Sequence, residues 1–144
     1  GYKFLYHTDG RYGNFLPLIF DELEADGLNP IERNGCNDIF EIRQRYPDKM
    51  LFGNVCCIHT LPHGTLGDVE DETLELIEKL GPQGGIFIGS SSEVHDAVPV
   101  ANAVRMYRTV HEYGVYPIDV DRIRARRAVL RKKNELKLRA DLPL

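Results

Sequence analysis

The fold is set by the stretch Lys3-Phe4-Leu5-Tyr6-His7-Thr8-Asp9-Gly10, in which apolar and aromatic residues run directly into polar groups and a glycine. This pattern predicts a short buried strand over about residues 2–7. Residues two apart in a strand lie on the same face, so the His7 imidazole and the Asp9 carboxylate are expected to point the same way. The pair is either part of a site at the end of the strand or a core histidine held by a neighbouring carboxylate.

Outward from this stretch, strand patterns alternate with helix patterns. Further strands are predicted at residues 28–32, 49–55 and 86–89, and helices at 15–23, 38–46, 68–80, 100–113 and from 119 or 121 to about 139. Strict alternation with buried strands implies an α/β fold with a parallel sheet and right-handed crossovers. A flavodoxin-like sheet and a segment of a (βα)8 barrel both fit this order, and four βα units are half of such a barrel.

Helix ends and one helix face are also predicted. Asn14 and Asn37 are candidate N-caps for the first and second helices, and Gly27 is a candidate C′ residue for the first. In helix 100–113 the helical spacing is expected to turn four apolar side chains inward, namely those of Ala103, Val104, Tyr107 and Val110.

Composition places the chain among ordinary globular domains. Its 144 residues suit one domain, with 42% hydrophobic and 28% charged residues, and no apolar run approaches the ~20 residues that span a bilayer. The three cysteines, Cys36, Cys56 and Cys57, are odd in number, which predicts reduced thiols in a cytoplasmic protein.

Charge is unevenly distributed along the chain. Residues 119–144 hold nine Lys or Arg and four Asp or Glu and so carry +5, which leaves −9 on residues 1–118 within the total of −4. We therefore predict a half-barrel domain over 1–118 and a basic C-terminal helix and tail over 119–144. Because this helix has no interleaved aromatic residues or glycines, we expect a solvated or partner-facing helix and no nucleic-acid ligand.

Each predicted strand ends in polar or ionisable groups. These groups are His7-Thr8-Asp9-Gly10, Glu32-Arg33-Asn34, Asn54-Val55-Cys56 and Ser90-Ser91-Ser92-Glu93. Ligands bind beyond the carboxyl ends of the strands in both parallel architectures. The sequence therefore predicts a functional face at this edge of the sheet.

Several chemistries are open for this face. The side chains that could hold a zinc-type ion are His7, Asp9, Glu32, Cys56 and His59, although no tight ligand spacing such as C-x-x-C is present. His7 with Asp9 or Glu32 could instead form an acid–base pair. A nucleophilic Cys56 or Ser91 has no supporting sequence context.

Several segments at these positions also carry a family resemblance. They are residues 6–10, 27–32 with Asp38, 51–55, 61–69, 84–88 and 98–103. In order and spacing they resemble the carboxy-terminal half of the uroporphyrinogen decarboxylase family, which includes the corrinoid-dependent methyltransferases. The resemblance covers about residues 1–115.

The resemblance implies that the chain forms the second half of a (βα)8 barrel. It also implies chemistry linked to tetrapyrroles, most directly methyl transfer from a small methylated substrate to a corrinoid, with decarboxylation of a porphyrinogen as the alternative that needs no cofactor. Some relatives hold zinc through a His-x-Cys pair and a later Cys. Here His7 matches the histidine, whereas Asp9 stands at the first cysteine and Ser90 or Ser91 near the second, which disfavours a sulfur-rich zinc site.

The roles that the resemblance implies fall on the same face. His7, Asp9 and Glu32 would be acid–base groups or ligands of a divalent metal. The substrate-binding set would be Asn54, Cys56, Ser90 and Ser91, with Cys56 replacing an Asp of the family pattern. In the true decarboxylase a histidine follows the last strand, where this chain has Gly89-Ser90-Ser91.

Half a barrel also predicts a partner, because its outer strands have unpaired edges. The missing half could belong to a longer chain, to a second copy or to a separate protein, and a corrinoid protein could be a further partner. We therefore expect little or no turnover from the isolated chain. From a different functional class, the chain could be a non-catalytic assembly or binding module.

Overall fold

Four short parallel strands form one sheet in the computed structural model, which describes residues 1–140. The strands are β1 (Leu5–His7), β2 (Gly27–Asn29), β3 (Met50–Phe52) and β4 (Ile86–Phe87), and they pair in the order β1-β2-β3-β4. A flavodoxin-like sheet has a different order, in which the second strand lies outside the first. The consecutive order excludes that alternative and is compatible with half of a barrel.

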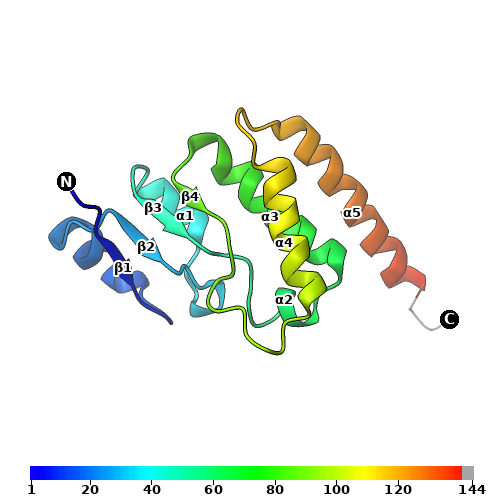
Figure 1. Cartoon of the computed structure of the whole chain (residues 1–144), viewed down its shortest axis with the longest axis horizontal. Coiled ribbons are helices and arrows are strands. Elements are labelled where there is room, and N and C mark those ends of the chain that lie inside the picture. Colours follow the sequence, from blue (N-terminus) through cyan, green and yellow to red (C-terminus); the bar gives the residue numbers. More distant parts are fainter. Residues whose placement is uncertain (141–144) are drawn as a thin grey trace.

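Within residues 1–140, five α-helices and four 3-10 or π-helical turns connect and follow the strands (Figure 1). The helices are α1 (Ile39–Arg45), α2 (Thr60–His63), α3 (Leu66–Leu80), α4 (Val100–Tyr113) and α5 (Val120–Ala140). The turns are η1 (Gly13–Phe15), η2 (Leu18–Glu22), η3 (Arg33–Gly35) and η4 (Gly81–Gln83). Predicted helices 100–113 and 119–139 are confirmed as α4 and α5. No helix among residues 1–140 is both long and apolar enough to cross a membrane.

The prediction of an α-helix over residues 15–23 is wrong. In its place the chain forms the 3-10 turn η1 and the π-helical turn η2, in which the Leu23 N–H donates to the Leu18 carbonyl at 2.9 Å. Asn14 lies inside η1 and caps no helix. Gly27 belongs to β2 because its N–H and that of Asp26 donate to the Phe4 carbonyl, which pulls this segment into the sheet.

The second and third strands are shorter than predicted. β2 ends at Asn29, since Pro30 has no N–H to donate to a neighbouring strand. β3 ends at Phe52, before Gly53, whose φ of +101° is a left-handed conformation that suits glycine. Beyond it, Val55 makes only an isolated bridge to Ser90.

The cap of α1 also differs from prediction. The Asp38 carboxylate, rather than Asn37, accepts from the Phe40 and Glu41 N–H groups at 2.7 and 3.3 Å. The N-terminus of α3 carries a reciprocal capping box between Thr65 and Asp68. These caps fix the starts of the two helices that cover the sheet.

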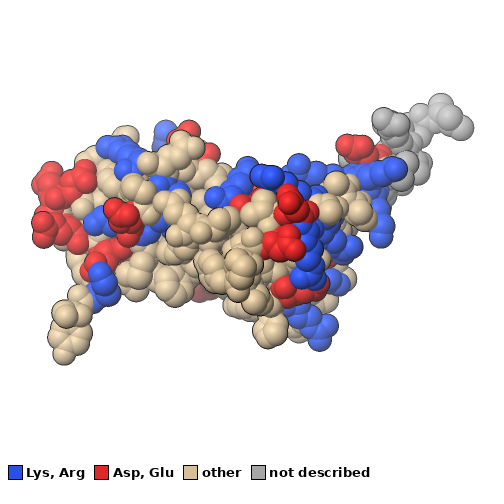
Figure 2. Space-filling view, turned by 90° about the horizontal axis from the view of Figure 1, so that it is seen from above, with Lys and Arg blue, Asp and Glu red and all other residues tan. Residues whose placement is uncertain are grey.

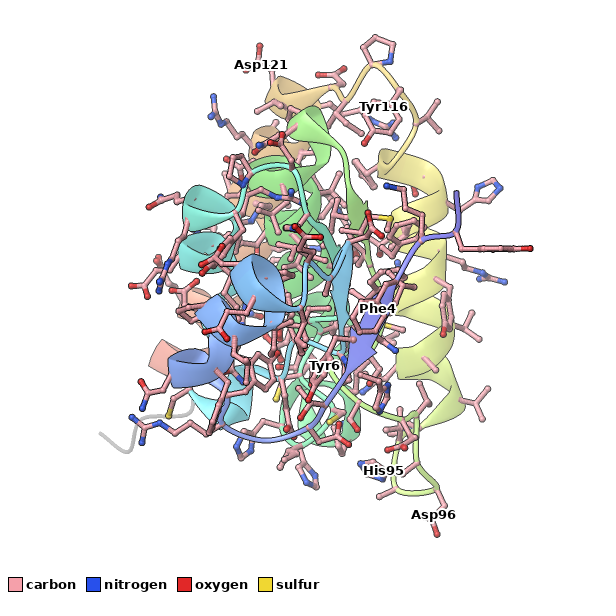
Figure 3. All side chains as sticks on the ribbon, turned by 90° about the vertical axis from the view of Figure 1, so that its left-hand side faces the viewer. Phe4, Tyr6, His95, Asp96, Tyr116 and Asp121 are labelled. Atoms are coloured by element: carbon pink, nitrogen blue, oxygen red, sulfur yellow. The ribbon has the colours of Figure 1, made fainter. Side chains whose placement is uncertain are left out.

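The two faces of the sheet have different surroundings. Tyr6, Leu28, Leu51 and Ile86 point into the main core, which also holds apolar residues of α1 and α3. The alternate positions lie on the other face, and Phe87 there is 53% exposed. We call this second surface the open face. In Figure 3, α1 lies to one side of the strands and α4 to the other, so α4 flanks the open face.

Helix α4 is oriented differently from the sequence prediction. It packs on α3, and its buried residues are Asn102, Met106 and Thr109. Ala103 is partly buried against the core, as expected. Val104 and Tyr107 were expected to face inward and are instead 39% and 57% exposed, because α3 covers the neighbouring face of the helix.

Helix α5 docks on α3 at the end of the molecule farthest from β1 (Figure 1). Ile123 and Leu130 of α5 form a small second core with Leu74 and Ile77 of α3. Figure 2 shows that Lys and Arg side chains gather at this end. The predicted basic segment is therefore a docked helix, and positions 141–144 of that segment lie outside the described residues.

Candidate functional site

His7 lies at the carboxyl end of β1, and its imidazole is exposed on the open face. Its Nδ1 atom is 3.2 Å from the Asn29 side-chain nitrogen, and its Nε2 atom is 3.9 Å from Asp9 Oδ2. When the Asn29 amide donates to Nδ1, the neutral ring carries its proton on Nε2, on the side of Asp9. The predicted pairing of His7 with Asp9 is thus present, and Asn29 is an additional partner.

The Glu32 carboxylate serves the loop that follows β1. Its Oε2 atom accepts from the Gly10 N–H at 2.8 Å, and the Asn37 amide donates to the Gly10 carbonyl at 2.7 Å. Gly35 packs so closely on Gly10 that an added Cβ would collide with the Gly10 carbonyl. Glu32 therefore positions the loop that carries Asp9.

The candidate metal ligands do not form a metal site by themselves. Among the described residues, no group of three His, Cys, Asp or Glu side chains is arranged to hold a metal ion. His7 and Asp9 lie together, while Glu32 is engaged by the Gly10 N–H. These side chains consequently do not fit a three-ligand ion, and a zinc-type site built on them would need ligands from outside residues 1–140.

Three of the predicted substrate-binding residues form hydrogen bonds with the main chain and so have a structural role. Asn54 is buried and donates through Nδ2 to the Ile31 carbonyl at 2.7 Å. Cys56 is buried, and its sulfur accepts from the His59 N–H. Ser91 is fully buried and accepts from the Cys57 N–H at 3.1 Å. Their polar groups fix the chain after β3 and β4.

Ser90 lies at a hollow on the open face. This hollow, of about 520 Å³, lies between the strands and α4; its lining includes Asn29, Phe52, Phe87, Ser90, Tyr107 and Val110. We call it the sheet hollow. The Ser90 hydroxyl is buried and has no hydrogen-bond partner among the described residues. Ser90 thus lines the hollow, and its hydroxyl and Asn54 Oδ1 are the polar atoms of the predicted substrate-binding set that are buried without a hydrogen-bond partner among the described residues.

An aromatic pair forms part of the wall of the sheet hollow. The Phe52 and Phe87 rings stack with centroids 4.4 Å apart and an angle of 5° between their planes. The two residues are direct partners in the β3–β4 register. Sequence reasoning did not select them, although both belong to the open-face set of their strands, which is the signal that would have found them.

The loop after β4 is tied to the loop after β3. His95 Nε2 lies 2.9 Å from the Cys57 carbonyl, and the Ala97 N–H donates to His95 Nδ1. His95 and Asp96 lie at the end of this loop in Figure 3. Hydrogen bonds from its own N–H and from the Ser92 hydroxyl lower the pKa of Glu93, with smaller contributions from the charges of His7 and His95.

Comparison of the chain with models of known families, with curated proteins and with solved structures finds no match of any of the three kinds.

Proposed function

We propose that the open face of the sheet binds a tetrapyrrole and that the chain takes part in methyl transfer from a small methylated substrate to a corrinoid. The observation that carries this proposal is the stacked Phe52–Phe87 pair in an open hollow of about 520 Å³, whose lining also includes Asn29, the hydrogen-bond partner of His7. Flat aromatic surfaces favour stacking with a planar macrocycle. A bound corrinoid would supply the cobalt that accepts the methyl group.

In this proposal His7 is the acid–base group. Its Nε2 proton faces open space and the Asp9 carboxylate, so it can be given to the substrate atom that loses the methyl group. Asn29 fixes the ring through Nδ1. The Ser90 hydroxyl would donate to a polar group of the ligand.

Binding of hydroxocobalamin by the purified chain tests the proposal. Phe87→Ala removes one ring of the stacked pair, and we expect its dissociation constant to rise about tenfold, equivalent to ~1.4 kcal/mol. Phe15→Ala is the matched control, because Phe15 is similarly exposed, at 57%, but lies in η1. The readout is the change in cobalamin absorbance on titration.

Two outcomes would contradict the proposal. One is a chain that binds no cobalamin. The other is equal weakening by Phe87→Ala and Phe15→Ala, since the stacked pair would then have no specific part in binding.

Porphyrinogen decarboxylation is the second candidate on the same face. It needs a proton delivered to carbon, and the exposed Nε2–H of His7 can deliver one without a cofactor. Parallel titration with a carboxylated porphyrin separates the candidates. Tighter binding of the porphyrin than of the corrinoid, with the same sensitivity to Phe87→Ala, would favour decarboxylation.

The non-catalytic module is the candidate from another class. It is favoured by the structural use of Asn54, Cys56 and Ser91, which leaves few predicted site residues free to act on a ligand. A folded chain that binds neither corrinoid nor porphyrin would support it.

The proposed partners and location follow from the proposed reaction. A small methylated substrate and a corrinoid protein are the expected partners, and the cytoplasm is the expected location. The three cysteines support this location, because none of them forms a disulfide.

A further inference from the structure

Arg43 of α1 is a buried arginine at the amino ends of the strands, and the residue is only 4% exposed. One terminal nitrogen of its guanidinium donates to the carbonyls of Pro47 and Lys49 at 2.7 and 2.9 Å, and the other donates to the Gly85 carbonyl at 2.8 Å. Lys49 and Gly85 directly precede β3 and β4. Arg43 therefore lies at the opposite edge of the sheet from His7, which ends β1.

The positive charge of Arg43 has no direct acidic partner among the described residues. All of its hydrogen bonds go to neutral main-chain carbonyls, and its Nε–H group is buried without an acceptor within residues 1–140. Burial lowers the pKa of Arg43, and the charge of Asp48 opposes this shift only in part. A buried guanidinium without a counter-charge is unfavourable, so an anion bound beside it would stabilise it.

A hollow of about 560 Å³ lies beside Arg43, between α1 and α3. Two further cations line it, Lys79 of α3 and Arg124 of α5. The carboxylate in the lining is that of Glu78, and it already pairs with Arg124 at 2.9 Å. Three positive groups and one negative group give this lining a charge of +2. We call it the basic hollow.

The two cations at the rim of the basic hollow have donors to spare. Lys79 uses one N–H for Glu75, and Arg124 uses Nε for Glu78, so the other N–H groups of both side chains make no hydrogen bond within the part of the chain that the structure describes. Both side chains are also well exposed to solvent. A ligand in the hollow can therefore accept from Lys79 and Arg124 at the same time.

We propose that the basic hollow binds the phosphoryl group of a small phosphate ester. Three cations around one site suit a dianion better than the single charge of a carboxylate, and arginine and lysine N–H groups are strong donors to phosphate oxygens. Lys79 and Arg124 make the direct contacts. Arg43 attracts the anion through its charge, because its Nε–H is buried.

The size and the remaining lining of the basic hollow favour an ester over a free ion. Its volume lies within the range of about 300 to 1,000 Å³ that is usual for small-molecule pockets, which is far more than one phosphate fills. Phe40, Pro47 and Leu80 give it apolar surface for an organic group, and Gln44 adds an amide. Because the basic hollow and the sheet hollow have no lining residue in common, this site is independent of the proposed tetrapyrrole binding.

Titration of the purified chain with phenyl phosphate at constant ionic strength tests the proposal. The Arg43 Nε–H signal in proton–nitrogen NMR spectra should shift to saturation, because a negative charge arrives beside it. Lys79→Gln and Arg124→Gln should each raise the dissociation constant about tenfold, since each removes a charge-assisted contact. Arg43 is left intact because three main-chain carbonyls depend on it.

Arg122→Gln is the matched control. Arg122 is also an exposed arginine of α5 that pairs with a glutamate, but it lies outside the lining of the basic hollow. Its substitution should leave the affinity for phenyl phosphate unchanged. Equal weakening by Arg124→Gln and Arg122→Gln would overturn the site, as would an Arg43 signal that does not move or a chain that does not bind phenyl phosphate.

Two companion ligands identify the chemistry of the site. Benzoate carries a single charge on the same ring and should bind about tenfold more weakly than phenyl phosphate. Equal binding of benzoate would overturn the assignment to a phosphoryl group. Inorganic phosphate lacks the ring and should also bind more weakly, and equal binding of this ion would overturn the assignment to an ester.

Discussion

At the scale of single residues, buried amide side chains hold the loops that form the candidate site. Asn37 donates to the Gly10 and Glu32 carbonyls, and Asn102 donates to the Leu61 and Gly64 carbonyls at 2.8 and 2.9 Å. Because these carbonyls are buried or partly buried, an amide that satisfies two of them at once is difficult to replace. Asn37 thus holds the loop that carries Asp9, and Asn102 ties α4 to the C-terminal end of α2.

We predict that Asn102→Ala lowers the free energy of unfolding by about 2 kcal/mol, because one buried and one partly buried carbonyl lose their donor. Urea denaturation measures the change. Asn14→Ala is the control, since Asn14 is exposed in η1, and its effect should stay within about 0.5 kcal/mol. Equal effects of the two substitutions would show that the amide does not support the fold.

The residues of the candidate site were predictable only in part. The proximity of His7 and Asp9 follows from their spacing, because side chains two apart in extended chain point the same way. Asn29 comes from another strand, and its contact with His7 depends on the β1–β2 register. The structural roles of Asn54 and Ser91 also could not be predicted from the sequence, because their hydrogen-bond partners are main-chain groups of distant segments.

At the scale of elements, α5 is attached to α3 largely through ion pairs. Arg127, whose side chain is 7% exposed, lies 2.9 Å from Asp71, 3.3 Å from Glu75 and 2.5 Å from Glu78. Glu70 forms a second centre, paired with Arg126 of α5 and Arg105 of α4. Four basic residues of α5 therefore pair with acidic residues of α3, namely Arg124, Arg126, Arg127 and Arg131.

We predict that Arg127→Met lowers the free energy of unfolding by about 3 kcal/mol, near the lower end for breaking a buried pair, because the acids on α3 remain partly hydrated. Arg124→Met is the control. Arg124 also pairs with Glu78, but its side chain is 64% exposed, so its loss should cost less than about 1 kcal/mol. Similar losses in both variants, measured by urea unfolding, would contradict the special role of Arg127.

The same ion pairs predict a pH dependence. Burial alone would raise the pKa of Glu75 and Glu78, but hydrogen bonds from Lys79 and Arg127 to the first, and from Arg127 and Arg124 to the second, lower both pKa values overall. A lowered pKa means that the stabilisation is complete above the ordinary value of 4.5 and is lost as the pH falls through the folded-state pKa.

We therefore expect the free energy of unfolding to fall from about pH 5 to about pH 3, with α5 contributing to the loss. Arg127→Met should show a shallower fall, because it has already lost the pairs that titrate. Urea unfolding at a series of pH values measures both curves. Parallel curves for the two proteins would show that these carboxylates do not carry the acid sensitivity.

Helices and strands were predicted best where the pattern that indicates them lies within the segment itself. Helices α4 and α5 have uninterrupted helical patterns, and α4 has the predicted bounds. The segment of η1 and η2 has an apolar stripe like that of a helix, yet it forms two irregular turns, because the Phe4 carbonyl accepts from the Asp26 and Gly27 N–H groups and so draws Gly27 into β2. Phe4 lies more than twenty residues before Asp26 and Gly27 in the sequence, so the residues around η1 and η2 carry no local pattern that would predict this contact.

At the scale of the whole molecule, the open face leaves the candidate site accessible to water. Catalysis by an acid–base group depends on a shielded pocket, in which charges interact strongly and the substrate is held in position. In a single copy, the sheet hollow and His7 are open on the side away from α1 and α3. A single copy therefore provides only one wall of the candidate site, and the opposite side is open to solvent.

We predict that the chain has no measurable turnover with a methylated substrate and a corrinoid under conditions in which sedimentation shows a monomer. Turnover should appear only when the open face is covered. The rate of methyl transfer is measured from the change in corrinoid absorbance, at protein concentrations below and above those at which sedimentation shows self-association. Enzymatic turnover by a proven monomer would contradict this expectation.

The sequence by itself determined the class of fold, the order of the elements and the polar groups that follow the strands. These properties depend on local periodicity, on turn residues and on the alternation of strands with helices, all of which are written in neighbouring positions. The proximity of His7 to Asp9 belongs to this group, whereas the exposure of the pair was seen only in the structure.

Only the tertiary structure decided which strands are neighbours, which face of the sheet is covered and which polar side chains are already engaged. The strand order excluded the flavodoxin-like sheet, and the packing of α4 on α3 left Val104 and Tyr107 exposed. Each of these outcomes depends on contacts between segments that are distant in the chain, where packing and main-chain hydrogen bonding override local pattern.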